Sequence, residues 1–185
     1  MRKDFGSKPW MYPLPVLIIG AYDENGKANA MNAAWGGIYE ANQVVLCLSE
    51  GHKTTKNIRE TGAFTVNIAD AAHMLAADYV GLVSGNTAAD KMERAGFHTV
   101  KSGFVNAPII EELPMALECR LVKFNEDGNI VGEIVNVSAD ERVLGADGLI
   151  DAAKVGAITF DPVHNAYLRL GEKVGSAFRD GAELG

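Results

Sequence analysis

The feature that most constrains the fold is a series of short apolar segments separated by turn-forming residues. Leu14–Tyr22 ends at the sequence DENG, and Leu117–Phe124 is joined to Ile130–Val137 by NEDGN. Because Asn and Gly tolerate the positive φ angles of tight turns, both places predict β-hairpins. Ala63–Ile68 alternates apolar and polar residues, which predicts a further strand with only one face buried.

Short helices are predicted between these strands. Ala71–Val80 is rich in alanine and offers Met74, Leu75 and Val80 to one buried face, and Asp90–Ala95 is followed by a glycine that would end a helix. A length of 185 residues suits one domain, residues 1–185. The combination predicts a mainly β fold with short helices, an antiparallel barrel or sandwich with helical additions.

The composition excludes several classes of function. A net charge of −7 disfavours nucleic acid and anionic membrane as partners. No apolar run reaches the roughly 20 residues needed to span a bilayer, and the first ten residues lack the apolar core of a signal peptide, so we expect a cytoplasmic protein. Cys47 and Cys119 lie in apolar stretches without CxxC spacing, which predicts two buried free thiols.

The segment from Val44 to Ile58, VVLCLSEGHKTTKNI, is the strongest candidate for a binding site. Val44–Leu48 is predicted to be a strand buried on both faces, and the residues after it to open a helix that stops at Gly62. The first turn of a helix leaves backbone N–H groups without partners and carries partial positive charge, so hydroxyls and a lysine there suit a phosphate. The alternative is that Thr54 or Thr55 only caps the helix.

Two other features of this region also allow two interpretations. Lys53, Lys56 and Arg59 are spaced to lie along one side of the helix, as a basic site or as an ordinary solvated face. Lys27–Tyr39 is rich in small residues, as expected for a platform on which a ligand approaches the backbone, or for a glycine-weakened strand with a bulge. The loop Gly81–Asn86 is either the rim of a ligand site or a plain connector.

Several common kinds of reactive site are missing from the sequence. The four histidines show no metal-binding spacing, so no metal site is expected. There is no GxSxG elbow, and no cysteine in a basic, exposed context, to serve as a nucleophile. P-loop and GxGxxG motifs are also absent. A phosphate-binding loop without a protein nucleophile is typical of proteins in which a bound cofactor carries the reaction.

The sequence resembles the flavin reductase-like, flavoredoxin-type proteins over nearly its whole length. The matching segments include PLPVLIIGAYDENGKANAMNAAW, HKTTKNI, FTVNI, GLVSG with the following DK, ALEC and YLRLGEKVGSAF, in this order. Members of that family fold as an FMN-binding split β-barrel and form homodimers, so the resemblance implies this fold, this cofactor and a homodimer with the flavin near the subunit interface. The aromatic, glycine-spaced tail at Tyr167–Phe178 is unlike a frayed end, and we expect it to pack on the neighbouring subunit.

The resemblance also implies which residues contact FMN. A strand segment lays its backbone along the isoalloxazine ring, and it corresponds to Met31, Asn32, Ala33, Ala34 and Trp35. The loop that holds the phosphate corresponds to Ser49, His52, Lys53 and Thr54, and Ser84 and Lys91 are further contacts. Where many relatives have arginine or proline after the strand's serine, this chain has Glu50 and Gly51, which questions the phosphate contact on that side.

Three functions are compatible with the sequence. In the first, NADH or NADPH delivers a hydride to flavin N5 and the protein is an NAD(P)H-dependent flavin reductase. In the second, FMN stays bound and the protein carries electrons between redox protein partners. The third is a non-catalytic split-barrel module without flavin. Because no nicotinamide site is visible in the sequence, the choice between reductase and carrier depends on the resemblance alone.

Overall fold

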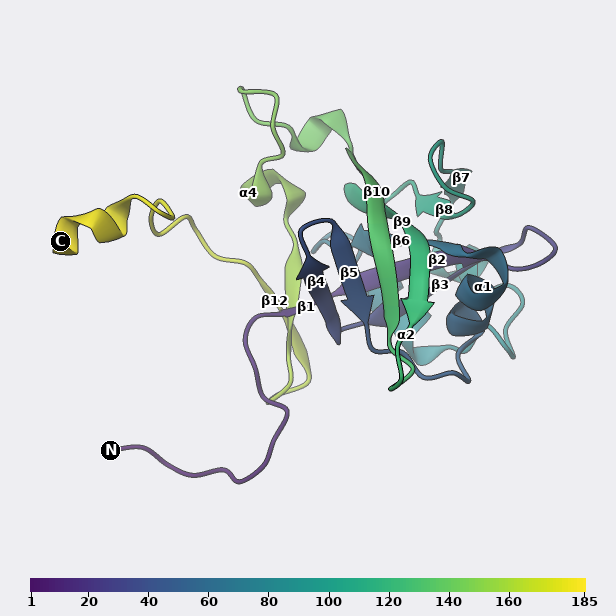
Figure 1. The fold of residues 1–185 in the computed structure, drawn as a ribbon, viewed down its shortest axis with the longest axis horizontal. Helices are drawn as coiled ribbons and strands as arrows, with labels where there is room; N and C mark the ends of the chain where they lie inside the picture. The colour runs from purple at the N-terminus through teal and green to yellow at the C-terminus, as the bar shows by residue number, and fades with distance from the viewer.

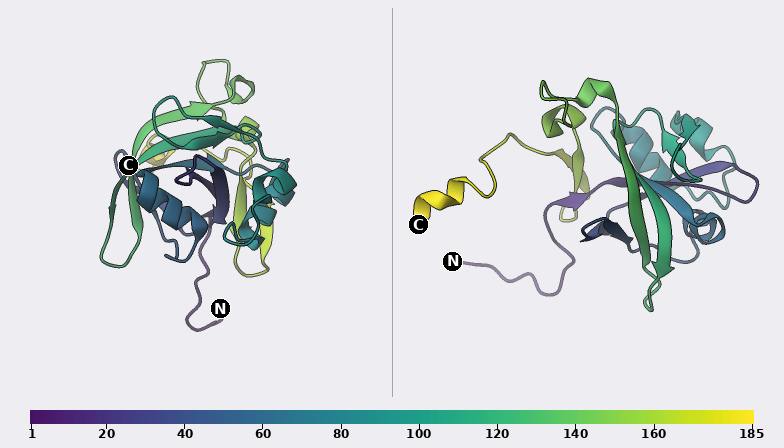
Figure 2. Two further views of the ribbon diagram at one scale, coloured as in Figure 1. Left: turned by 90° about the vertical axis from the view of Figure 1, so that its right-hand side faces the viewer. Right: turned by 45° about the horizontal axis from the view of Figure 1, so that its top comes forward.

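The fold is built on one seven-stranded antiparallel sheet, seen in a computed structural model that describes residues 1–185. The sheet curls into a half-barrel with short helices beside it, as Figures 1 and 2 show. This confirms the mainly β, split-barrel fold that the sequence predicts. In spatial order the strands are β3 (Ala28–Ala33), β2 (Leu17–Tyr22), β6 (Ala63–Ile68), β9 (Met115–Phe124), β10 (Ile130–Ala139), β5 (Gln43–Leu46) and β4 (Gly36–Glu40).

Both predicted hairpins are present. Strand β2 pairs with β3 around a turn in which Gly26 has φ of 76° and the N–H of Asp23 donates to the carbonyl of Lys27 at 2.9 Å. Strand β9 pairs with β10 around a turn with Gly128 at φ of 79°. A Cβ atom is strained at these angles, so glycine determines where each chain reversal occurs.

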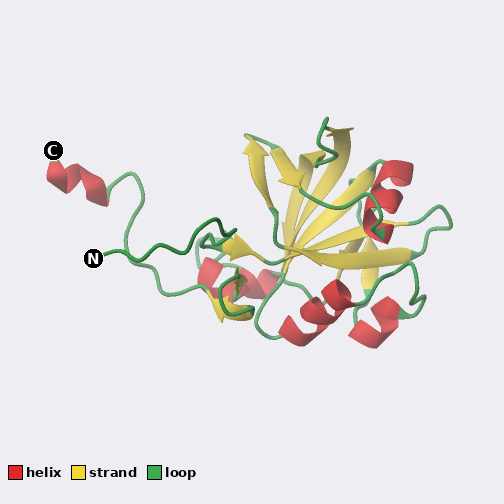
Figure 3. Cartoon of the chain, turned by 90° about the horizontal axis from the view of Figure 1, so that it is seen from below, coloured by secondary structure: helices red, strands yellow, loops and turns green.

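Smaller elements complete the chain. A three-stranded sheet contains β1 (Leu14–Pro15), β11 (Ile158–Asp161) and β12 (Ala166–Arg169), and a two-stranded sheet contains β7 (Thr99–Lys101) and β8 (Pro108–Ile110). Figure 3 shows the helices around the sheets: α1 (Lys53–Thr61), α2 (Met74–Leu82), α3 (Lys91–Ala95), α4 (Ala152–Val155), η1 (Glu141–Val143) and η2 (Asp180–Leu184). None of these helices is both long and apolar enough to cross a membrane.

Two helices end where the sequence predicts, but two side chains of α2 that were predicted to be buried are exposed. Helices α1 and α3 stop at Gly62 and Gly96, whose φ angles are 68° and 70°, as the glycine positions predict. Helix α2 begins at Met74 rather than Ala71, and both Met74 and Leu75 are exposed. The expectation that these two side chains face the core was wrong, because the turn of α2 that packs against β3 presents Ala77 and Val80.

Most of the core consists of two large apolar clusters on the two faces of the sheet, and a third, small cluster contains Ala63, Val105 and Ala107. Strand β2 contributes to both, since Ile19 lies in the cluster inside the half-barrel and Ile18 lies in the cluster under α2 and α3. Phe64 of β6 is fully buried against Gly132, where an added Cβ would lie 2.3 Å from the ring. Burial of such a side chain contributes about 1.5 to 3 kcal/mol, so this close contact matters for stability.

Burial along two strands differs from the sequence prediction. Strand β6 is not half-buried, because Thr65 and Asn67 are also fully buried; Asn67 donates to the carbonyl of Ile18 at 3.0 Å. Strand β5 has alternating rather than two-sided burial, and Cys47, just after it, is exposed. The prediction of two buried thiols is therefore wrong for Cys47 and confirmed for Cys119, whose burial raises its pKa to about 12.

Both ends of the chain extend away from the body of the protein (Figure 1). The C-terminal tail, residues 171–185, contacts the half-barrel so little that Val174 and Phe178 have exposures of 102% and 110%. Apolar side chains of the N-terminal arm, residues 1–12, are exposed as well, among them Phe5 and Met11.

Candidate functional site

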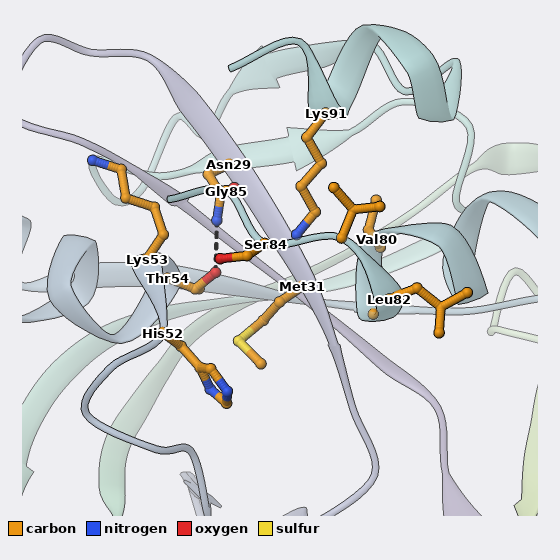
Figure 4. A pocket seen from close by; sticks show the side chains of 12 residues that line it. Asn29, Met31, His52, Lys53, Thr54, Val80, Leu82, Ser84, Gly85 and Lys91 are labelled. Carbon is orange, nitrogen blue, oxygen red and sulfur yellow. Dashed lines mark hydrogen bonds between the residues drawn. The ribbon is translucent and has the colours of Figure 1, made fainter. Parts of the chain in front are cut away.

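A groove formed by adjoining hollows follows β3, the edge strand of the large sheet. The first hollow is lined by Asn29 and Met31 of β3, by the start of α1 and by the segment between α2 and α3, which meet there although they are far apart in sequence (Figure 4). A second hollow shares Gly81 and Leu82 with the first. Because no strand pairs with the outer side of β3, backbone N–H and C=O groups remain available on that side.

The start of α1 offers unsatisfied hydrogen-bond donors to the first hollow. No side chain caps the helix at His52, and the first helical bond runs from the N–H of Lys56 to the carbonyl of His52 at 3.1 Å. The N–H groups of Lys53, Thr54 and Thr55 make no hydrogen bond in the structure. Together with the positive end of the helix dipole, such groups attract an anion.

Neither threonine caps the helix, so that alternative is wrong. Thr54 and Thr55 lie inside the first turn and are buried. The Thr54 hydroxyl accepts a hydrogen bond at 2.7 Å from the side-chain amide of Asn29, which ties α1 to β3 (Figure 4). The Thr55 hydroxyl is buried without a hydrogen-bond partner. These side chains therefore position the first turn of α1 and leave its N–H groups free.

Lys91 is the most unusual residue of the first hollow. Its residue exposure is only 3%, and its ammonium has no carboxylate partner within salt-bridge distance. Burial lowers the pKa of Lys91 to about 8 from 10.5. A buried cation without a counter-ion is unfavourable, and such groups are normally paired or bound to a ligand. An anion bound in the first hollow would therefore be stabilised by Lys91.

The Lys53 ammonium, in contrast, already has a partner. It lies 3.5 Å from the carboxylate of Asp23 and points away from Met31 (Figure 4). The pKa of Asp23 is lowered mainly by a hydrogen bond from the N–H of Lys27, with Lys53 contributing. The other two residues of the basic row do not reach the hollow: Lys56 is exposed, and Arg59 pairs with Glu50 at 3.3 Å. The side of α1 that carries Lys53, Lys56 and Arg59 is therefore mainly a solvated face.

The loop after α2 closes the first hollow. A Cβ at Gly85 would lie 2.2 Å from Oδ1 of Asn29, so only glycine permits this close approach. Asn86 donates to the carbonyl of Gly51 at 3.0 Å, which holds the loop against the start of α1. Glu50 is exposed and faces away toward Arg59. Glu50 and Gly51, which depart from the pattern of the resemblance, therefore make local polar contacts with Arg59 and Asn86.

The small-residue segment Lys27–Tyr39 divides into two strands with different surroundings. The side chain of Met31 faces the first hollow, whereas Asn32 donates to the carbonyl of Ala77 at 3.0 Å. Ala33 packs in the core of the half-barrel, and Trp35 is 56% exposed. The chain bends after Ala33, and the irregular pairing predicted for this segment occurs in β4, between Ile38 and Glu40.

The structure brings most, but not all, of the predicted site residues together. The first hollow contains Met31, His52, Lys53, Thr54, Ser84 and Lys91, and the second contains Asn32 and Ala34. Ala33, Trp35 and Ser49 line neither hollow. Among the other lining residues of the first hollow, Gly81, Leu82, Val83 and Gly85 lie in the loop that the sequence analysis considered as the rim of a ligand site, whereas Asn29 and Val80 were missed. Asn29 lies two positions before Met31, so strand periodicity could have identified it.

Comparisons with known proteins agree with this fold. A flavoredoxin structure from Desulfovibrio vulgaris (Miyazaki F) is 37% identical, has a TM-score of 0.94, and is matched over 98% of this chain and 100% of that chain. A flavoredoxin structure from Methanosarcina acetivorans is 30% identical with a TM-score of 0.89, over 100% and 99% of the two chains.

The sequence relatives include an uncharacterized protein from Aeropyrum pernix that is 28% identical over 121 residues. The match covers 64% of this chain and 46% of that protein, so the present chain spans about half the length of that relative. The flavin reductase like domain family matches residues 10–157, which include the groove and nearly all of its lining. The chain therefore belongs to the flavin reductase-like domain family.

Proposed function

We propose that the groove binds FMN, with the phosphate in the first hollow and the isoalloxazine ring along β3. The buried, unpaired ammonium of Lys91 carries this proposal, because a phosphate would supply its missing counter-ion. The free N–H groups at the start of α1 and the hydroxyl of Ser84 add hydrogen-bond donors in the same hollow. No residue is placed for covalent attachment, so the cofactor is expected to be released on denaturation.

The edge of β3 suits the flavin ring. Its outer backbone groups are free to pair with the polar edge of the ring, and the Met31 side chain offers an apolar, polarisable contact. When bound, FMN would supply reversible electron transfer, and the protein would hold and orient it. We propose NADH or NADPH as the reductant, which makes the protein an NAD(P)H-dependent flavin reductase-like oxidoreductase.

A second candidate function is that of an electron carrier with permanently bound FMN. It is supported by the similarity, along the full chain, to two structures described as flavoredoxins. In this case a redox protein, rather than a nicotinamide nucleotide, would reduce the bound flavin. Both functions need the same FMN site, so the flavin proposal does not depend on the choice between them.

Absorption spectroscopy tests these proposals directly. The purified protein is expected to be yellow, or to become so when titrated with FMN, and a protein that takes up no FMN would refute the flavin proposal. Anaerobic addition of NADH or NADPH then separates the candidates. Bleaching followed by steady NAD(P)H consumption with added flavin indicates a reductase, whereas reduction only by a protein partner indicates a carrier.

We also propose that the protein is a homodimer. The N-terminal arm and the C-terminal tail carry apolar side chains that have no cover in a single chain, including Val174 and Phe178. Exposed apolar surface of this kind is unfavourable in water and marks interaction sites. A second copy of the chain would bury these side chains against its own half-barrel.

A further inference from the structure

Asn29 is a buried residue of β3 that lines the first hollow beside the start of α1. Its side-chain nitrogen Nδ2 donates to the hydroxyl oxygen of Thr54 at 2.7 Å, as Figure 4 shows. Its side-chain oxygen Oδ1 lies beside Gly85, where an added Cβ would be 2.2 Å from it. The first turn of α1 and the loop after α2 therefore hold the Asn29 amide between them.

The direction of this hydrogen bond determines where the hydroxyl proton of Thr54 can go. An amide nitrogen can only donate, so the Thr54 oxygen accepts and its own proton needs another partner. Thr61, near the other end of α1, donates its hydroxyl proton to the carbonyl of Asn57, one turn earlier, at 2.9 Å. Thr54 donates to no atom of the protein, although it is only 1% exposed. The first hollow, which Thr54 lines, is the space left for this proton.

Unmatched donors therefore gather in the first hollow. A buried hydroxyl proton without an acceptor is unfavourable, as is a buried ammonium without a counter-ion. The hollow contains both, from Thr54 and Lys91, next to the free N–H groups at the start of α1. The oxygens of a phosphate are acceptors and can pair with all of these donors. A ligand that ends in a hydroxyl, such as riboflavin, offers them fewer acceptors and no charge.

We infer that Asn29 is a positioning residue for the phosphate: by donating to Thr54, it directs the Thr54 hydroxyl proton into the first hollow. The inference rests on the proposed function, because it needs a phosphate in that hollow. Asn29 acts through Thr54 and does not have to touch the phosphate itself. The alternative is that the contact only joins β3 to α1. A joint of that kind affects the stability of the fold, and it affects FMN and riboflavin alike.

A double-mutant cycle with two flavins distinguishes these roles. Its members are the wild type, Asn29→Leu, Thr54→Val and the double variant, all as full-length, FMN-free proteins. Leucine and valine have shapes close to those of the side chains they replace, and they remove the amide donor and the hydroxyl. Fluorescence titration gives the dissociation constants of riboflavin and FMN for each protein. The ratio of the two constants, riboflavin over FMN, reports on the phosphate, because both flavins share the ring.

The expected pattern is a loss that does not multiply. Thr54→Val should lower the ratio by about tenfold to a hundredfold, as expected for a charge-assisted hydrogen bond. Asn29→Leu should lower it by about twofold to tenfold, because the Thr54 proton loses its fixed direction. The double variant should match Thr54→Val, since Asn29 has nothing to act on without the hydroxyl. In the control Asn136→Leu, which removes an amide that donates to Glu118 at 2.7 Å, stability should fall and the ratio should stay unchanged.

Melting curves verify that each variant is folded during the titrations, and Asn29→Ala, which also removes the donor, replaces Asn29→Leu if leucine does not fit. An unchanged ratio in the Asn29 variant, or losses that multiply in the double variant, would overturn the inference. Lys91→Met separates this outcome from that of the proposed function. A selective loss of FMN in Lys91→Met with an unchanged ratio in the Asn29 variant refutes only the role of Asn29. Equal FMN binding by Lys91→Met and the wild type refutes the phosphate site and this inference with it.

Discussion

Replacement of Lys91 by methionine should have opposite effects on stability and on FMN binding. Methionine has a similar shape and no charge, so it fits the buried position without an unpaired cation. The pKa of Lys91 falls from 10.5 to about 8, and at about 1.4 kcal/mol for each pKa unit this corresponds to about 3 kcal/mol of unfavourable free energy at neutral pH. The FMN-free variant should therefore be more stable than the wild type by up to this amount.

FMN affinity should change in the other direction. A charge-assisted hydrogen bond to a phosphate contributes about 1.5 to 3 kcal/mol, so Lys91→Met should weaken FMN by about tenfold to a hundredfold. Riboflavin, which lacks the phosphate, should bind wild type and variant almost equally. Fluorescence titration with both flavins and denaturant unfolding of the FMN-free proteins measure the two effects. Lys56→Met is a matched control, because Lys56 lies exposed on α1 and should change neither quantity.

The pH dependence gives an independent test of the same residue. The unfolded chain binds more protons than the folded one between about pH 8 and 10.5, so the Lys91 contribution makes the FMN-free protein more stable as pH rises through this range. FMN binding needs the ammonium form and should weaken above about pH 8. Both effects should be missing in Lys91→Met. If this variant binds FMN as tightly as the wild type, the phosphate is held elsewhere and the assignment of the first hollow is wrong.

Three further predictions concern other parts of the groove and the chain ends. Thr54→Val leaves the buried Asn29 amide without its acceptor and should destabilise the fold by about 1 to 3 kcal/mol. It should also bind FMN more weakly than Thr54→Ser, which keeps the hydroxyl. Equal behaviour of the two variants in melting and titration would argue against the Asn29–Thr54 contact. Lys53→Ala should weaken FMN less than Lys91→Met, because its ammonium is paired with Asp23. Sedimentation should show a dimer for the whole chain, and deletion of residues 171–185 should weaken it; a monomeric mass for the FMN-loaded, full-length protein would refute the homodimer.

Local features of the sequence determined the hairpins and the helix ends. The DENG and NEDGN turns and the glycines after α1 and α3 act within a few residues, because the left-handed backbone angles that they adopt strongly favour glycine. The apolar segments between them were sufficient to predict an antiparallel β fold. The start of α1, with its uncapped backbone N–H groups, could also be predicted locally, since these donors belong to consecutive residues.

Only the tertiary structure decided which side chains are buried and which charges have partners. Lys53 and Lys91 are similar in sequence terms, yet Asp23 neutralises one and the other lies buried without a counter-ion. Asp78 and Tyr167 meet across 89 positions of the chain, and no local pattern indicates such a contact. Burial and charge pairing depend on neighbours that only the packing of the chain brings together, whereas turns depend on the backbone of a few residues.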